Sequence, residues 1–103
     1  MSDPMRIRAV MQGSDAVVRV LMSHEMESGQ RKDAAGAIIP AWYITDISAA
    51  LNGKLVLSAQ WGTAIAKNPF TQFTIKGAKS GDKISITWTD NRGDKRTDDA
   101  VVA

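Results

Sequence analysis

The chain has 103 residues, which is the size of one domain and enough to bury one modest hydrophobic core. Its formal net charge is only +2, from 13 Lys and Arg against 11 Asp and Glu. The basic residues are dispersed along the chain, which argues against a nucleic-acid-binding protein. The sequence contains no cysteine, so disulfides, thiolate metal ligands and thiol nucleophiles are all excluded.

The hydropathy of the sequence indicates whether the chain carries an export signal or a membrane helix. Residues 1–10 contain no apolar segment of the kind that an export signal needs. No apolar run approaches the roughly 18 residues required for a membrane helix. We therefore expect one soluble domain over residues 1–103, without an export signal of its own.

The first predicted element is a β-hairpin around Gly13-Ser14. With Gly13 at the first position of a two-residue turn, one side of the hairpin becomes wholly apolar. The pairs on that side are Met5 with Met22, Ile7 with Val20, Ala9 with Val18, and Met11 with Ala16. The other side places Arg8 opposite Arg19, where like charges repel. Either the two arginines splay into solvent, or an acidic partner surface lies against them.

A long connection over residues 28–41 leads to a second hairpin around Asn52-Gly53. A two-residue turn would place Leu51 opposite Lys54 and mix the two faces of the hairpin. A three-residue loop with Gly53 in a left-handed position keeps apolar residues together. It pairs Tyr43 with Trp61, Ile47 with Leu57, and Ala49 with Leu55. We expect the longer loop because it buries more apolar surface.

The last third of the chain predicts three more strands. Residues 71–76 and 83–89 alternate with period two, and their inward side chains are Phe73, Ile75, Ile84, Ile86 and Trp88. Residues 95–102 are polar and typical of an edge strand, whose register the pattern does not define. About seven short strands without a long helix predict an all-β sandwich or barrel.

His24 is the only histidine, and the sequence allows three interpretations of it. No G-x-S-x-G motif and no second histidine accompany it, so a structural, hydrogen-bonded histidine is favoured over a catalytic one. On a strand, Met22, His24 and Met26 would share one side and could offer two thioethers and an imidazole to Cu(I). A core position for Met22 and a gap-filling or interface role for Met26 are favoured over that copper site.

Two further patterns are best explained by turns. Gly77 to Lys83 resembles a phosphate-binding loop only superficially, because its glycine spacing is one residue short and a strand follows it. Four aspartates lie at or beside turns, where their carboxylates can accept hydrogen bonds from nearby amides: Asp15, Asp82, Asp90 and Asp94.

The placement of aromatic residues points to an interface. Trp42 falls on the opposite face from Tyr43 and lies just after the apolar stretch 37–40. Exposed Ile, Trp and Met side chains near one edge would form an interface cluster. The alternative, that the long connection folds back and covers them, is equally compatible with the sequence.

Several motifs in order resemble the SoxZ family of the bacterial thiosulfate-oxidising system. They begin with Asp3-Pro4-Met5-Arg6-Ile7-Arg8-Ala9, then His24-x-Met26-Glu27-x-Gly29-x-Arg31-Lys32-Asp33. Gln60-Trp61-Gly62, Lys67-Asn68-Pro69-Phe70, Gly77-Ala78-Lys79-x-Gly81-Asp82-Lys83 and Trp88-x-Asp90-Asn91-x-Gly93-Asp94 follow. The family often has proline after the motif histidine, where this chain has Glu25.

The resemblance implies an immunoglobulin-like sandwich that forms a heterodimer with SoxY. SoxY carries sulfur intermediates covalently on a cysteine of its C-terminal arm while other Sox enzymes act on them in turn. The chain would then be a non-catalytic subunit without cofactor, located in the periplasm after export with its signal-bearing partner. Its expected partner-binding residues are Met26, Arg31 and Lys32 from the family motif, and Ile39, Trp42 and Tyr43 from the apolar cluster.

Overall fold

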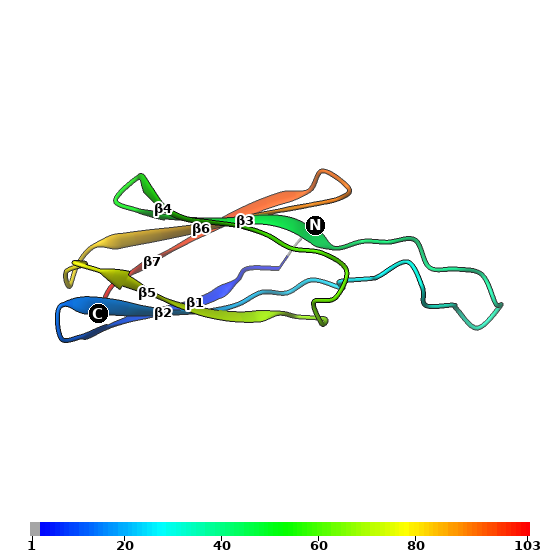
Figure 1. The fold of residues 1–103 in the computed structure, drawn as a ribbon, viewed down its shortest axis with the longest axis horizontal. Coiled ribbons are helices and arrows are strands. Elements are labelled where there is room, and N and C mark those ends of the chain that lie inside the picture. Colours follow the sequence, from blue (N-terminus) through cyan, green and yellow to red (C-terminus); the bar gives the residue numbers. More distant parts are fainter. Residues whose placement is uncertain (1–2) are drawn as a thin grey trace.

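Seven β-strands form two antiparallel sheets that pack face to face (Figure 1). This computed structural model describes residues 3–103. The strands are β1 (Arg6–Gln12), β2 (Asp15–Leu21), β3 (Ile44–Leu51), β4 (Lys54–Gln60), β5 (Phe70–Lys76), β6 (Lys83–Asp90) and β7 (Lys95–Val101). One sheet has the order β1-β2-β5 and the other β4-β3-β6-β7. The all-β, immunoglobulin-like sandwich expected from the sequence is confirmed.

The first hairpin has the predicted register. Ile7 pairs with Val20, Ala9 with Val18, and Arg8 with Arg19. Gly13 has a φ of 65°, the left-handed conformation that the first position of this turn requires. The apolar side of the hairpin faces the opposite sheet, and β5 extends the sheet on the other edge of β2.

The second hairpin differs from the prediction. Leu51 pairs with Lys54, so the loop has two residues, and both Asn52 and Gly53 have positive φ. The register shifts between Ala49 and Ala50, which pair with Leu57 and Leu55 and leave Val56 as the extra residue. This β-bulge places Leu57 opposite Ala49 and Ala59 opposite Ile47, whereas Leu55 stays exposed. The predicted pairs of Ile47 with Leu57 and of Ala49 with Leu55 are therefore wrong. The predicted pairing of Tyr43 with Trp61 is also wrong, because the amide of Trp61 donates to the carbonyl of Thr45.

The core lies between the two sheets and uses the residues that alternation predicted. Trp88, Ile84 and Ile86 from β6 are almost completely buried, as are Val18 and Val20 from β2. Phe73 is half-buried and packs against this core. Each fully buried side chain of this kind contributes about 1.5–3 kcal/mol relative to its exposed state.

The polar last strand is an edge strand, as predicted, and the structure supplies its register. β7 pairs with β6 so that Thr97 lies opposite Thr87 and Ala100 opposite Ile84. Asp98 accepts a hydrogen bond from the amide of Met5 at 2.9 Å and pairs with Arg96, which ties the N-terminal segment to this sheet. Within residues 3–103 no helix has the length and apolar character needed to cross a membrane.

Candidate functional site: a projecting arm and its buried base

The connection between β2 and β3 does not fold back over the sandwich. Residues 27–42, called the arm below, run outward and return as two extended segments that project beyond one end of the sheets (Figure 1). The molecule is accordingly elongated, with extents of 53 × 21 × 20 Å. Residues 30–38 are all exposed, and the side chain of Ile38 keeps 61% of its surface accessible. The alternative left open by the sequence is thereby settled in favour of an exposed segment.

The tip of the arm is shaped by Asp33. Its carboxylate oxygen Oδ1 accepts hydrogen bonds from the amides of Ala35 and Ala37, at 2.9 and 3.0 Å. Its carbonyl accepts one from the amide of Gly36, whose φ is 83°. Such side-chain-to-backbone bonds define a tight turn without packing from the rest of the protein. The arm therefore has a local structure of its own.

The base of the arm is closed by hydrogen bonds between its two segments. Glu27 and Trp42 exchange backbone hydrogen bonds of 2.6 and 2.9 Å. The guanidinium of Arg31 pairs with the carboxylate of Glu27. At Gly29 the segments approach so closely that an added Cβ would lie 3.2 Å from the Cβ of Ala41. Glycine permits both this approach and a φ of 85°.

At the base of the arm, the buried residues His24 and Asp90 form a cluster with Trp42, which is half-buried. The carboxylate oxygen Oδ2 of Asp90 accepts hydrogen bonds from His24 Nε2 at 3.0 Å and from Trp42 Nε1 at 2.7 Å. Its other oxygen accepts from the amides of Arg92 and Asp94, at 3.0 and 2.9 Å. Asp90 terminates β6, so these bonds connect the arm to the core of the sandwich.

Both ring nitrogens of His24 are engaged. Nδ1 accepts a hydrogen bond of 3.1 Å from the amide of Met26, so the ring proton lies on Nε2 and is donated to Asp90. The backbone of His24 is fixed by Asn68, through its side chain at 3.1 Å and its amide at 2.9 Å. An imidazole that donates and accepts in this way positions the chain, and neither nitrogen is free to activate a nucleophile.

The pKa of Asp90 reflects two opposing effects. Burial alone would raise the pKa of this carboxyl group, because its side chain is almost fully removed from solvent. The hydrogen bonds from His24, Trp42 and the two amides outweigh burial and hold the pKa below its usual range. Asp90 is therefore a buried carboxylate that stays ionised and organises the donors around it.

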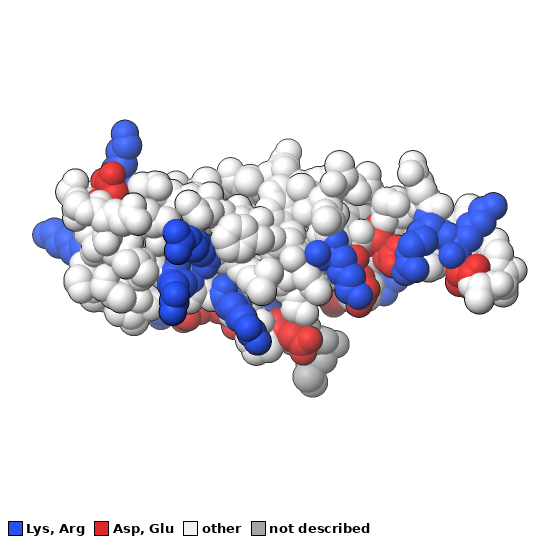
Figure 2. All heavy atoms as spheres, turned by 90° about the horizontal axis from the view of Figure 1, so that it is seen from below, with Lys and Arg blue, Asp and Glu red and all other residues white. Residues whose placement is uncertain are grey.

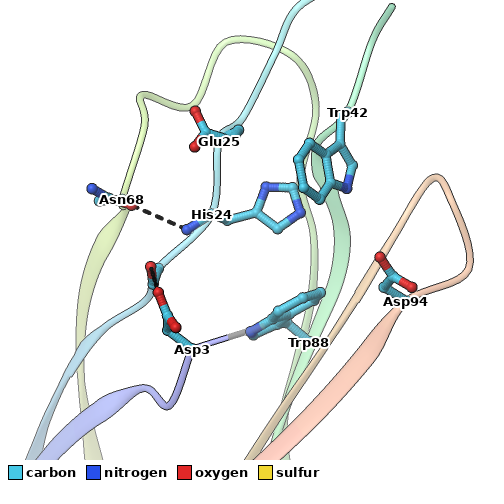
Figure 3. Close-up of a pocket in the computed structure, with 8 residues that line it drawn as sticks. Asp3, His24, Glu25, Trp42, Asn68, Trp88 and Asp94 are labelled. Atoms are coloured by element: carbon cyan, nitrogen blue, oxygen red, sulfur yellow. Dashed lines mark hydrogen bonds between the residues drawn. The ribbon is translucent and has the colours of Figure 1, made fainter. Parts of the chain in front are cut away.

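A cavity of about 130 Å³ opens beside the cluster (Figure 3). The rings of His24, Trp42 and Trp88 point toward one another along one side of it. The centroid of the His24 ring lies 5.1 Å from that of each indole, in an edge-to-face arrangement. The acidic residues Asp3, Glu25 and Asp94 also line it. Arg92 lies over Trp42, with its guanidinium carbon 4.2 Å from the ring centroid, and covers part of that indole.

The predicted partner-binding residues differ in how far they are exposed to solvent. Arg31 and Lys32 are exposed on the arm, whereas Ile39, Trp42 and Tyr43 are half-buried along its returning segment. Met26 is only 6% exposed and has a φ of 50°, and its sulfur accepts the amide of Ile44 at 3.3 Å. It lies under the arm and supports it.

The alternative copper site has little support in this geometry. Met22, His24 and Met26 are all buried, as alternation implied. The imidazole nitrogens and the sulfur of Met26 already take part in hydrogen bonds, and Met22 belongs to the core. In residues 3–103 no cluster of three or more His, Cys, Asp or Glu side chains has the arrangement of a metal site.

The role of Asp90 was not identified from the sequence. Its position beside a turn predicted bonds to local amides, and these are present. Asp90 lies 66 positions from His24 and 48 positions from Trp42 along the chain. The spacing of residues in the sequence does not predict contacts over such separations. The same holds for Asn68, which fixes His24 from the connection before β5.

Comparison with known proteins agrees with the motifs. The family described as "Sulphur oxidation protein SoxZ" matches residues 5–101, which is nearly the whole chain. No curated protein sequence matches it. The matched range includes both sheets, the arm and the His24–Asp90–Trp42 cluster. The chain belongs to the SoxZ family.

Proposed function

We propose that the chain is the non-catalytic subunit of a heterodimeric sulfur carrier in thiosulfate oxidation. In this proposal it binds a SoxY subunit, whose C-terminal cysteine arm holds sulfur intermediates for other Sox enzymes. Membership of the SoxZ family supports a role in sulfur oxidation. The observation that carries the binding role is the arm, which is exposed over residues 30–38 and attached to the sandwich only at its base.

The chemistry of the chain supports a platform without catalytic activity of its own. With no cysteine, the chain offers no second thiol that could take sulfur from the partner by exchange. Its only histidine is buried, with both nitrogens hydrogen-bonded. The acid–histidine pair therefore holds the base of the arm in place. Purified alone, the chain is expected to show no thiosulfate turnover.

The proposed interface follows the exposed side of the arm. Arg31 and Lys32 contribute charge on the outgoing segment, and the apolar surface comes from Ile38, Ile39, Trp42 and Tyr43 on the returning segment. An apolar centre with a charged rim is typical of protein interfaces. Met26 contributes by supporting this surface from within.

Ile38→Asp tests this interface. The side chain of Ile38 is 61% exposed and distant from the core, so its replacement leaves the fold intact while placing a charge in the proposed contact. Leu55→Asp is the matched control, because Leu55 is also 61% exposed but lies on β4, toward the other end of the sandwich (Figure 1). We expect Ile38→Asp to weaken binding to SoxY at least tenfold, by about 1.4 kcal/mol or more, in isothermal titration.

Two results would contradict the proposal. Free monomers of the unmodified chain and SoxY in gel filtration would refute the heterodimer. A heterodimer weakened by Leu55→Asp and not by Ile38→Asp would move the interface to β4. Trp42→Ala is a less specific test, because it also removes the hydrogen bond to Asp90.

The proposed location is the periplasm, reached together with a signal-bearing SoxY. The support for this proposal is membership of the SoxZ family, whose role is in sulfur oxidation. Co-expression with SoxY should place the chain in the periplasmic fraction, and removal of the partner's signal should retain it in the cytoplasm. Periplasmic recovery without SoxY would contradict joint export.

A further inference from the structure

The two outer faces of the sandwich differ in charge. The outward side chains of β1, β2 and β5, called the basic face below, include four cations, Arg6, Arg8, Arg19 and Lys76, and one acid, Asp15. The outer face of the other sheet is rich in serine and threonine, and its Lys83 pairs with Asp99 at 3.3 Å. Figure 2 shows the basic face, where blue side chains stand among white ones over the sheet.

The arginines of the basic face have no acidic partner in residues 3–103. No carboxylate there lies within ion-pair distance of Arg6, Arg8 or Arg19. Arg8 lies directly opposite Arg19, and Nε of Arg19 donates only to the side chain of Gln72, at 3.2 Å. Directly opposed like charges on adjacent strands are unfavourable unless an acidic group comes between them.

Apolar side chains accompany these charges. Arg6, Leu21 and Phe70 form one row across the three strands, and Phe70 is 59% exposed. Val10 and Leu21 are each 40% exposed on the same face. Arginine together with exposed aromatic and aliphatic side chains is the composition that protein interfaces favour.

We propose that the basic face is a second docking surface, which binds a partner protein through carboxylates arranged around an apolar side chain. Each guanidinium can hold one carboxylate with two parallel hydrogen bonds, and an acidic group between Arg8 and Arg19 would relieve their repulsion. The apolar residues of the partner would cover Phe70 and Leu21. This surface is separate from the arm, so the inference does not rest on the proposed function.

A protein fits this surface better than a nucleic acid or a membrane. The net charge of the chain is only +2, far from the strongly positive balance of nucleic-acid-binding domains. Anionic lipid surfaces are recognised by clusters of about 4–8 Lys or Arg through their charge. This face has four cations and one acid, and its exposed Phe70, Leu21 and Val10 add an apolar surface beside them. A carboxylate-rich protein surface matches both the charged and the apolar parts.

The test uses the full, isotope-labelled chain and the peptide acetyl-Glu-Glu-Leu-Glu-Glu-amide, followed by NMR. We expect shift changes in β1, β2 and the first half of β5, weaker at high ionic strength. Arg8→Gln/Arg19→Gln should weaken binding about fivefold to tenfold, as the loss of two exposed ion pairs predicts. The matched control, Lys54→Gln/Lys79→Gln, removes the same charge from other exposed sites and should change binding less than twofold.

Defined outcomes would overturn the proposal. Shift changes spread over Lys54 and Lys79, or equal effects of the two double variants, would show unspecific attraction. Equal binding of the Gln-Gln-Leu-Gln-Gln peptide would show that the carboxylates contribute nothing. Tighter binding at the same residues by a short DNA duplex, or by vesicles of equal parts phosphatidylcholine and phosphatidylglycerol, would assign the surface to those partners instead.

Discussion

Asp90 is the residue on which the base of the arm depends. It accepts four hydrogen bonds, from two side chains and two amides, and each of its oxygens has two donors. An amide side chain of the same shape has one oxygen and one nitrogen, so it would direct its own donors at two of these groups. The residue therefore has to be a carboxylate, and it has to be ionised.

Asp90→Asn should lower the free energy of unfolding by about 2–4 kcal/mol at neutral pH, because it leaves buried donors unpaired. The pKa of Asp90 is lower in the folded chain than in the unfolded one, so its stabilisation is complete above the unfolded pKa, about 3.9. It is lost as the pH falls through the folded pKa. Urea titrations should therefore show the difference between the two proteins narrowing below about pH 4.

The same substitution at an exposed carboxylate distinguishes the effect of burial from the loss of charge alone. Asp99→Asn changes an exposed carboxylate on β7, whose pKa is lowered by a hydrogen bond from Ser85 and by Lys83, and should cost far less stability. A stability difference between Asp90→Asn and the unmodified chain that stays constant down to strongly acidic pH would show that ionisation of Asp90 is not the source of the effect.

At the scale of elements, the arm combines a rigid base with a locally formed tip. Gly29→Ala should disturb the base, because it adds a Cβ 3.2 Å from Ala41 at a φ of 85°. Gly53→Ala is the matched control, since Gly53 also has a φ of 85°, has no atom within 4 Å of the added Cβ, and lies in the turn between β3 and β4, away from the arm. Both pay a similar backbone cost of about 1–2 kcal/mol. We expect only Gly29→Ala to reduce the affinity for SoxY more than fivefold in isothermal titration. Denaturant midpoints of both variants, measured in parallel, show whether either substitution has also lowered stability.

A second substitution checks the cause. Ala41→Gly removes the methyl group that the new side chain would meet, so Gly29→Ala/Ala41→Gly should recover much of the lost affinity. Equal losses of affinity for Gly29→Ala and Gly53→Ala would show that the close approach at the base has no special role.

The sequence predicted those elements whose register burial alone determines. The first hairpin has one register that separates apolar from polar residues, and that register is present. The second hairpin has two solutions, and the structure has a two-residue turn with a bulge at Val56. This arrangement places Leu57 opposite Ala49 but leaves Leu55 exposed, so burial alone did not select it. The local sequence pattern could not predict that the arm projects from the sandwich, because this depends on long-range contacts. The pairing of His24 with Asp90 was hidden for the same reason.

In the whole molecule, the arm and the basic face lie at different places along the long axis. The arm projects from one end, the turn between β3 and β4 lies toward the other, and the basic face runs along the sandwich between them (Figures 1 and 2). A subunit built in this way can hold one partner at the arm while a flat side stays accessible. The proposed SoxY interface and the proposed acidic partner therefore need not compete.

Hydrogen exchange on the whole chain tests this separation. The few backbone hydrogen bonds of the arm, such as that from Ile39 to Arg31, hold an exposed segment, so its amides should exchange much faster than those of β6 in the core. Addition of SoxY should slow exchange across residues 30–39 at least tenfold, because binding both covers and orders them, and should leave β1 and β5 unchanged. Protection of the three-stranded sheet with an unprotected arm would instead make the basic face the heterodimer interface, and the two surfaces proposed for this chain would exchange roles.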